Sequence, residues 1–174
     1  MTRAGPVLEL ATVDSYHHGY RRRDKLDEWH HELLAFRLGA EEYALDILRI
    51  REIMKPREVT EVPRAPAFVL GVVAVRGLVL PVIDLRLRLR LPAAAVTRDA
   101  RILIVTKGEE RYGMIVDGVH QVVRLREEDV EPPPRTLGAH EAEFLAGIGR
   151  PRPDRMLILL NLDAVLTFRV GVRP

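Results

Sequence analysis

The sequence predicts an all-β protein made of many short strands. From Leu33 onward, short apolar runs alternate with turn residues, a pattern typical of strands joined by tight connections. Of the 174 residues 47% are hydrophobic but only 5% are aromatic, so the core is built mainly of Val, Leu, Ile and Ala, which favours strands. The chain has no cysteine, so disulfides and cysteine-ligated metals take no part in its fold.

The predicted strands follow one another with clear punctuation. A hairpin turns at residues 39–42, and the strand over 47–54 places Ile50 and Ile53 inward. Residues 61–68 and 131–136 are predicted to be loops between strands, because they contain prolines, which have no backbone N–H to donate. The strands over 101–106, 111–116 and 119–125 are predicted to form a meander. The predicted strands cover residues 33–38, 43–47, 47–54, 68–75, 78–85, 101–106, 111–116, 119–125, 143–150 and 155–160.

Two segments near strand ends carry helix signals. Asn161 is a good capping residue and predicts a short helix over residues 161–168. The segment LRLRLRL over 85–91 admits two interpretations. Its alternation predicts a strand with Arg86, Arg88 and Arg90 on one face, whereas the preceding Asp84 is a good helix cap. Periodicity alone does not decide between them.

The sequence also indicates the organisation of the chain. Residues 1–31 differ from the rest in their basic run YRRRDK and polar patch DEWHHE, and are predicted to be an N-terminal extension, either flexible or helical. Residues 169–174 are a predicted C-terminal tail. Gly71 and Gly147 each open a similar strand, turn and strand pattern, which favours a pair of small barrels.

Charge and hydropathy predict a cytoplasmic protein. Glu9 and Asp14 interrupt the apolar core that a signal peptide needs. A membrane-spanning helix needs about 20 apolar residues, and Arg76 lies near the middle of the only apolar stretch of interest, residues 68–85. The formal charge of +2 gives a weak field. Nucleic acid remains a remote alternative, because the run YRRRDK and the alternating Arg86, Arg88 and Arg90 could contact phosphates, although an aromatic stacking platform is missing.

No pattern in the sequence points to an enzyme, a metal or a cofactor. Ser15 is the only serine and lies in the extension, away from any nucleophile elbow, and no glycine-rich phosphate loop is present. The histidines lack the spacing of a zinc site, and His120 is expected to be an ordinary strand residue. The acidic pairs lie in predicted turns or loops, where their charges are solvated; they are Glu109 with Glu110, Glu127–Asp129, and Glu141 with Glu143.

Many short segments, taken in order, resemble the CheW-like domain, the coupling module of bacterial chemosensory arrays. Each match is weak alone, but their order over residues 32–168 is specific. The sequence departs from the usual pattern at Ala74, where the family has Asn, and at Asn161, where it has Asp. The matching segments are residues 43–46, 50–53, 62–63, 65–66, 68–69, 71, 75–77, 81–85, 116–119, 144, 147–148 and 159–162.

The resemblance implies a specific fold and function. The fold would be two small five-stranded Src-homology-3-like β-barrels packed together, with short helices that include one at the C-terminus and one over residues 85–91. The function would be that of a stand-alone, non-catalytic adaptor that couples chemoreceptors (methyl-accepting chemotaxis proteins) to the regulatory domain of a CheA-type histidine kinase. It would need no cofactor and would reach membrane-associated receptor arrays through its partners. An adaptor in a related pathway for motility or development is the alternative.

The resemblance also places a receptor-binding surface. The coiled-coil tip of the receptor is expected to dock between the barrels, as an amphipathic helix in an apolar groove. Glu52 and Arg76 are expected to lie near that surface with opposite charges. The kinase is expected to contact exposed apolar residues at a barrel end. The predicted receptor-binding residues are Ile50, Glu52, Val73, Val75, Arg76 and Gly77.

Overall fold

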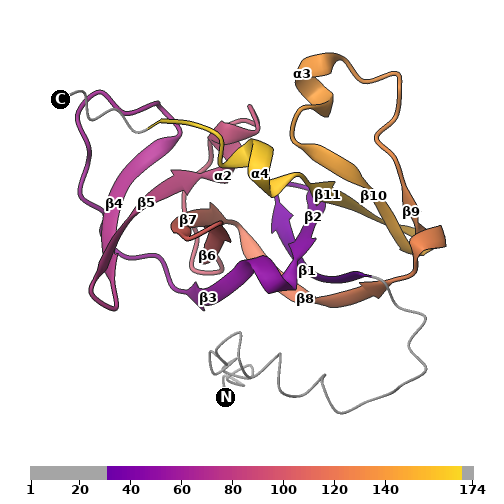
Figure 1. Cartoon of the computed structure of the whole chain (residues 1–174), viewed down its shortest axis with the longest axis horizontal. Coiled ribbons are helices and arrows are strands. Elements are labelled where there is room, and N and C mark those ends of the chain that lie inside the picture. The colour runs from indigo at the N-terminus through magenta and orange to yellow at the C-terminus, as the bar shows by residue number, and fades with distance from the viewer. Residues whose placement is uncertain (1–30, 170–174) are drawn as a thin grey trace, which may run out of the picture.

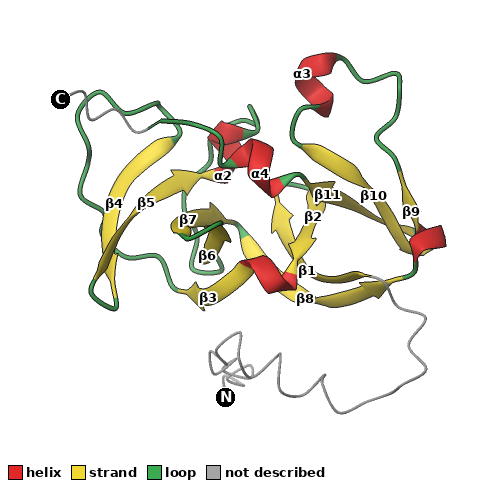
Figure 2. Cartoon of the chain, viewed as in Figure 1, coloured by secondary structure: helices red, strands yellow, loops and turns green. Residues whose placement is uncertain are grey.

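The computed structural model describes residues 31–169, and these form two β-sheets with a few short helices (Figure 1, Figure 2). The predicted extension and C-terminal tail therefore lie outside the described residues, apart from His31, which begins the first strand, and Arg169. None of the described helices is long and apolar enough to cross a membrane. The prediction of an all-β protein with small helices is confirmed.

The first sheet, barrel A, contains six strands in the order β8-β1-β2-β11-β10-β9. Neighbouring strands are antiparallel except β2 and β11, which run parallel. The strand β9 has only two residues and was not expected from the sequence. The strands are β1 (His31–Leu38), β2 (Glu41–Asp46), β8 (Gly118–Leu125), β9 (Val130–Glu131), β10 (Leu145–Arg152) and β11 (Arg155–Leu160).

The second sheet, barrel B, contains five strands in the order β3-β6-β7-β5-β4. Its one parallel pair joins β5 and β7, in the same relation as β11 and β2 in barrel A. The strands are β3 (Ile50–Met54), β4 (Val69–Val75), β5 (Leu78–Asp84), β6 (Arg101–Lys107) and β7 (Glu110–Val116).

The two barrels exchange a strand. The chain forms β1 and β2 in barrel A and then sends β3 into barrel B, where it pairs with β6. Likewise β6 and β7 belong to barrel B, but β8 crosses to barrel A and pairs with β1. The predicted meander of β6, β7 and β8 is therefore wrong in its last step. The physical reason is that the chain bends at Asp117, after which β8 pairs along the edge of β1 with one irregularity between Leu34 and Phe36.

A glycine lies where each barrel closes. After β3 the chain returns to β4 through a bridge between Thr60 and Val72, and after β8 it returns to β10 through β9. A Cβ atom on Gly71 would lie 2.2 Å from the carbonyl oxygen of Thr60, and one on Gly147 would lie 2.6 Å from that of Glu131. The sequence repeat that begins at Gly71 and Gly147 is therefore explained by the structure, because in both barrels a backbone carbonyl oxygen approaches the glycine too closely for a Cβ atom.

Strand alternation divides the apolar residues among three cores. In β6, Ile102 and Ile104 face the interior of barrel B, whereas Leu103 and Val105 face a larger core that the two barrels share. In β1, Leu33 and Ala35 line barrel A, and Phe36 joins the shared core. Both faces of such strands are buried, which explains why their sequences are almost continuously apolar.

The short helices α2 (Leu85–Arg88) and α4 (Leu162–Val165) lie near the centre of the molecule, beside the ends of both sheets (Figure 2). Asp84 caps α2 by accepting from the amide of Leu87, and Asn161 caps α4 by accepting from the amide of Ala164. The helical interpretation of residues 85–91 is therefore correct for its first turn. Three further short helices were not expected: η1 (Ile47–Arg49), η2 (Glu127–Asp129) and α3 (Ala139–Ala142).

Candidate functional site

Glu52 of β3 and Arg76 of the loop between β4 and β5 meet on the surface of barrel B. Two guanidinium N–H groups of Arg76 donate to the two carboxylate oxygens of Glu52, at 3.1 and 3.2 Å. This bidentate contact fixes the plane and direction of the guanidinium. Glu52 raises the pKa of Arg76 through these hydrogen bonds, so the charge of the arginine is secure. The Arg76 side chain stays 69% exposed and therefore free to meet a partner on its outer side.

The backbone of Arg76 is held in an unfavourable conformation. Val75 pairs with Leu78, so Arg76 and Gly77 form a two-residue hairpin loop between β4 and β5. Both have positive φ angles, 50° and 80°, as in the type I′ turn that matches strand twist. The first loop position normally takes Asn, Asp or Gly, because a larger side chain is strained there. An arginine kept at such a position is typical of a functional residue.

A pocket of about 470 Å³ lies beside this ion pair. Its floor includes the buried residues Ile53 and Met54 at the end of β3. Its rim carries three cations and one carboxylate, and that carboxylate, Glu52, is already engaged by Arg76. The pocket is lined by Glu52, Ile53, Met54, Lys55, Pro56, Arg57 and Arg76.

The predicted receptor-binding residues divide into two groups. Ile50 is 1% exposed and belongs to the shared core, and Val73 and Val75 are 6% and 7% exposed inside barrel B. These three residues support the site from below and offer no surface to a partner. The reason is strand alternation, because Val73 and Val75 face the interior of barrel B while Ala74, between them on β4, is exposed. Glu52, Arg76 and Gly77 remain as surface residues.

Sequence reasoning missed several surface residues near the site. Lys55 and Arg57 line the pocket and are exposed. The sequence did contain a signal: Lys55 and Arg57 flank Pro56, and residues two apart in an extended stretch place their side chains on one side. Leu78 and Val79, 47% and 71% exposed, follow the same hairpin loop, and their exposure could not be read from an apolar run.

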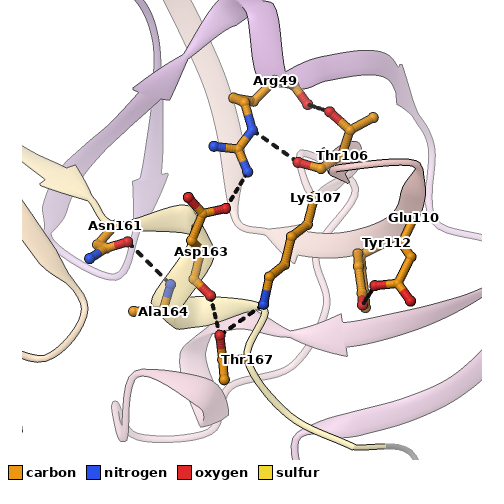
Figure 3. Close-up of polar contacts among 9 residues, drawn as sticks. All are labelled: Arg49, Thr106, Lys107, Glu110, Tyr112, Asn161, Asp163, Ala164 and Thr167. Atoms are coloured by element: carbon orange, nitrogen blue, oxygen red, sulfur yellow. Dashed lines mark hydrogen bonds and ion pairs between the residues drawn. The ribbon is translucent and has the colours of Figure 1, made fainter.

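A polar junction fixes helix α4 to barrel B (Figure 3). Arg49 of η1 donates to the carbonyl oxygen of Thr106 at 3.0 Å and to the carboxylate of Asp163 at 2.6 Å. Lys107 donates to the hydroxyl of Thr167 at 2.9 Å, and that hydroxyl donates to the carbonyl oxygen of Asp163. The hydrogen bond from Arg49 lowers the pKa of Asp163. Since α4 follows a strand of barrel A, these contacts couple the two barrels.

Arg88 lies at the centre of the same region. Its guanidinium carbon is 4.6 Å from the centre of the Phe68 ring and 4.7 Å from that of Phe144, which is cation–π geometry. Burial lowers the pKa of Arg88. Its N–H groups donate to the three carbonyl oxygens of Ala164, Val165 and Thr167.

The arginines of residues 85–91 are therefore engaged within the protein. Arg86 forms a close ion pair with Asp117, which also accepts from the amide of Gly39. Arg90 pairs with Glu143 at 3.6 Å. The strand interpretation of this segment, which set the three arginines on one face for contact with phosphates, does not hold. The nucleic-acid alternative loses one of its two basic features; the other, the run YRRRDK over residues 20–25, lies outside the described residues.

The described residues contain no group of three or more His, Asp or Glu side chains that could hold a metal ion. His120 lies in β8, as expected, and contacts the carboxylate of Glu42 at 2.7 Å. Glu42 also receives two hydrogen bonds from Arg155, which is the main reason that its pKa is lowered. This cluster joins strands β2, β8 and β11 on the outside of barrel A.

The structure is thus a pair of β-barrels that exchange strands, with a charged pocket on the surface of barrel B. A family model described as CheW-like domain matches residues 32–169. The chain belongs to the CheW-like family, as the sequence resemblance indicated.

Comparison with individual proteins agrees with this assignment. The chain is 37% identical to the chemotaxis protein CheW of Helicobacter pylori over 78% of this chain and 81% of that protein. It is 31% identical to the protein FrzA of Myxococcus xanthus, over 78% of this chain and 84% of that protein. Its structure is similar to the crystal structure of the scaffolding protein TtCheW from Thermoanaerobacter tengcongensis, with a TM-score of 0.73 and 33% identity, over 80% and 94% of the two chains.

Proposed function

We propose that this protein is a non-catalytic adaptor that couples chemoreceptors to a CheA-type histidine kinase. Its membership of the CheW-like family supports this function, as do relatives that are named chemotaxis proteins and a scaffolding protein. An adaptor needs two contact surfaces and no reaction chemistry, because receptor conformation biases the kinase through differences in contact free energy. Its place in the cell is then the membrane-associated receptor array, which it reaches through its partners.

The receptor surface is the exposed part of the predicted site. The observation that carries this proposal is the strained, outward-facing Arg76, whose guanidinium is already oriented by Glu52. A preoriented arginine binds a partner with little further loss of side-chain freedom. Gly77 keeps the tip of the hairpin narrow, while Ile50, Val73 and Val75 hold β3 and β4 in place from the barrel interior.

The test is co-sedimentation of the full chain with a receptor cytoplasmic fragment from the same organism. We expect Arg76→Ala to fold normally and to lose most of its receptor binding. The matched control is Arg111→Ala, an exposed arginine on β7 that pairs with Thr106 at the other end of β6. Unchanged binding by the Arg76 variant would remove the proposed receptor surface.

The kinase surface is proposed for exposed apolar residues at the end of barrel B. Val79 is 71% exposed, the highest value among the large apolar side chains of the described residues. We expect Val79→Asp to weaken binding to the kinase regulatory domain and to leave receptor binding intact. Loss of both partners at once, with normal circular dichroism, would show that the two surfaces are not separate.

The alternative pathway, in motility or development, rests on the similarity to the protein FrzA. An adaptor in that pathway would have the same fold and the same kinds of contact, so only the identity of its partners distinguishes it from a chemotaxis adaptor. A pulldown of the tagged full chain from its native cell identifies the kinase and receptor that it joins. The genes that lie next to those of the identified partners then indicate whether the pathway controls chemotaxis, motility or development.

A further inference from the structure

The rim of the pocket carries more positive charge than its one carboxylate, Glu52, neutralises. Arg76 is neutralised by Glu52, but Lys55 and Arg57 line the same pocket without a carboxylate of their own among its residues. Arg57 makes one long hydrogen bond, 3.4 Å, to the carbonyl oxygen of Ala74, which leaves its other N–H groups available. Within residues 31–169 Lys55 makes no hydrogen bond or ion pair, and both side chains are exposed.

The spacing of these two cations is set by the backbone. Residues 55–59 form an irregular extended segment directly after β3. Lys55 and Arg57 line the same pocket, and two residues of chain span at most about 7 Å. The Cβ atoms of residues one turn apart on a helix are about 5 to 6 Å apart, so the flexible side chains of two acidic residues there can reach both cations.

The segment favours a helical partner over an added strand. Pro56 lies between the two cations and has no backbone N–H, so a strand placed along it would lose a hydrogen bond of the ladder. Binding through side chains avoids that loss. The apolar floor under the rim, Ile53 and Met54, gives a helix with one apolar face something to cover.

We propose that Lys55 and Arg57 recognise a pair of carboxylates one turn apart on the receptor helix that docks at this pocket. This inference rests on the proposed receptor surface and adds the chemistry that selects the receptor. Arg76 positions the helix, and the two further cations discriminate acidic receptor tips from neutral or basic ones. Electrostatic matching of this kind affects specificity and association rate more than total affinity.

The test measures binding of the full chain to the receptor cytoplasmic fragment at two salt concentrations. We expect Lys55→Gln with Arg57→Gln to weaken binding about tenfold at 0.05 M salt and less than about threefold at 0.5 M, because salt screens exposed charges. The matched control is Arg111→Gln with Arg135→Gln, which removes two exposed positive charges outside the pocket and should leave binding unchanged.

Charge reversal then identifies the matching group on the partner. The Lys55→Glu, Arg57→Glu variant is measured against a panel of receptor fragments, each with the acidic residues of one exposed helix turn changed to lysine. Recovery of binding with one member of the panel supports the proposal. If no member restores binding, or if the Gln variant binds like the unchanged protein, the carboxylate pair is not recognised here.

The outcomes separate this inference from the proposed function. If Arg76→Ala loses receptor binding while the Lys55, Arg57 variant does not, the receptor surface stands and the carboxylate site is wrong. If neither variant affects binding, or the receptor fragment does not bind at all, both proposals fail. A single-stranded oligonucleotide is titrated in parallel; tight, salt-dependent binding that the same Gln substitutions abolish would assign the cations to phosphates instead.

Discussion

Phe68 and Phe144 occupy equivalent positions in the two barrels and lie against the same guanidinium, that of Arg88. Each phenylalanine comes three residues before a glycine that closes its barrel, Gly71 or Gly147. The carbonyl oxygen of Phe68 accepts from the residue that caps α2, and that of Phe144 accepts from the residue that caps α4, both at 2.8 Å. The two halves of the molecule are thus repeats, and one arginine joins them.

Replacing Arg88 should therefore destabilise the contact between the barrels. Arg88→Ala removes the contacts with Phe68 and Phe144 and the hydrogen bonds to the carbonyl oxygens of Val165 and Thr167, so we expect a loss of about 3 kcal/mol. Arg88→Lys keeps the charge but not the planar fork, and should lose about half as much. Urea unfolding followed by circular dichroism measures both. Equal stability of the lysine variant and the unchanged protein would contradict the stacking argument.

Alanine at the closing glycines should affect both barrels in the same way. A Cβ atom at Gly71 or Gly147 would lie against a backbone carbonyl oxygen that cannot move without opening the bridge. We expect Gly71→Ala and Gly147→Ala each to lose about 3 kcal/mol or more. Gly77→Ala is the control, because its Cβ would meet nothing within 4 Å and only the positive φ is unfavourable, at about 1 kcal/mol. Denaturant unfolding midpoints of the three variants give the comparison.

The pair of Asp117 and Arg86 should make the fold sensitive to acid. Burial raises the pKa of Asp117, but hydrogen bonds from Arg86 and from the amide of Gly39 outweigh it, so the folded pKa is lowered. The resulting stabilisation is complete above the unfolded value of about 4 and is lost as pH falls through the folded pKa.

The measurement is the free energy of unfolding of Asp117→Asn between pH 7 and pH 3. We expect this variant to be about 2 kcal/mol less stable at pH 7 and the difference to shrink in acid, where the unchanged protein also loses the charge. Asp163→Asn is the control, because the Asp163 side chain is 63% exposed and its pair with Arg49 should contribute less. A pH-independent difference at Asp117 would show that packing alone is lost.

Substitution of the strained arginine should separate folding from function. Asn tolerates the left-handed conformation of the first loop position better than Arg does, so we expect Arg76→Asn to keep or raise the urea midpoint. It cannot make the bidentate contact with Glu52 and should bind receptor poorly. A variant that is clearly less stable would instead make Arg76 a structural residue.

Much of the fold follows from local patterns. Most strand positions and the helix capped by Asn161 were predicted, because alternation and capping residues act over a few neighbouring positions. The helix after Asp84 was predicted only by the family resemblance. Glu52 and Arg76 were also chosen correctly as a pair, although from the family resemblance and not from their spacing.

The elements that failed have a common cause. The alternation of residues 85–91 predicts a strand equally well, but Arg86 and Arg88 find partners at Asp117 and in α4 that lie far away in the sequence. Val73 and Val75, which were predicted to bind the receptor, are buried, because an apolar strand can bury either face. Local sequence patterns do not specify which distant residue a side chain will contact.

Local patterns and the family resemblance were enough to predict the all-β class, most of the strands and the family. It took the folded structure to show that β3 and β8 exchange barrels and that Lys55 and Arg57 share a pocket with Arg76. The physical reason is that hydrophobic periodicity specifies that a residue is buried but not against which sheet. That choice depends on backbone pairing between strands distant in the chain.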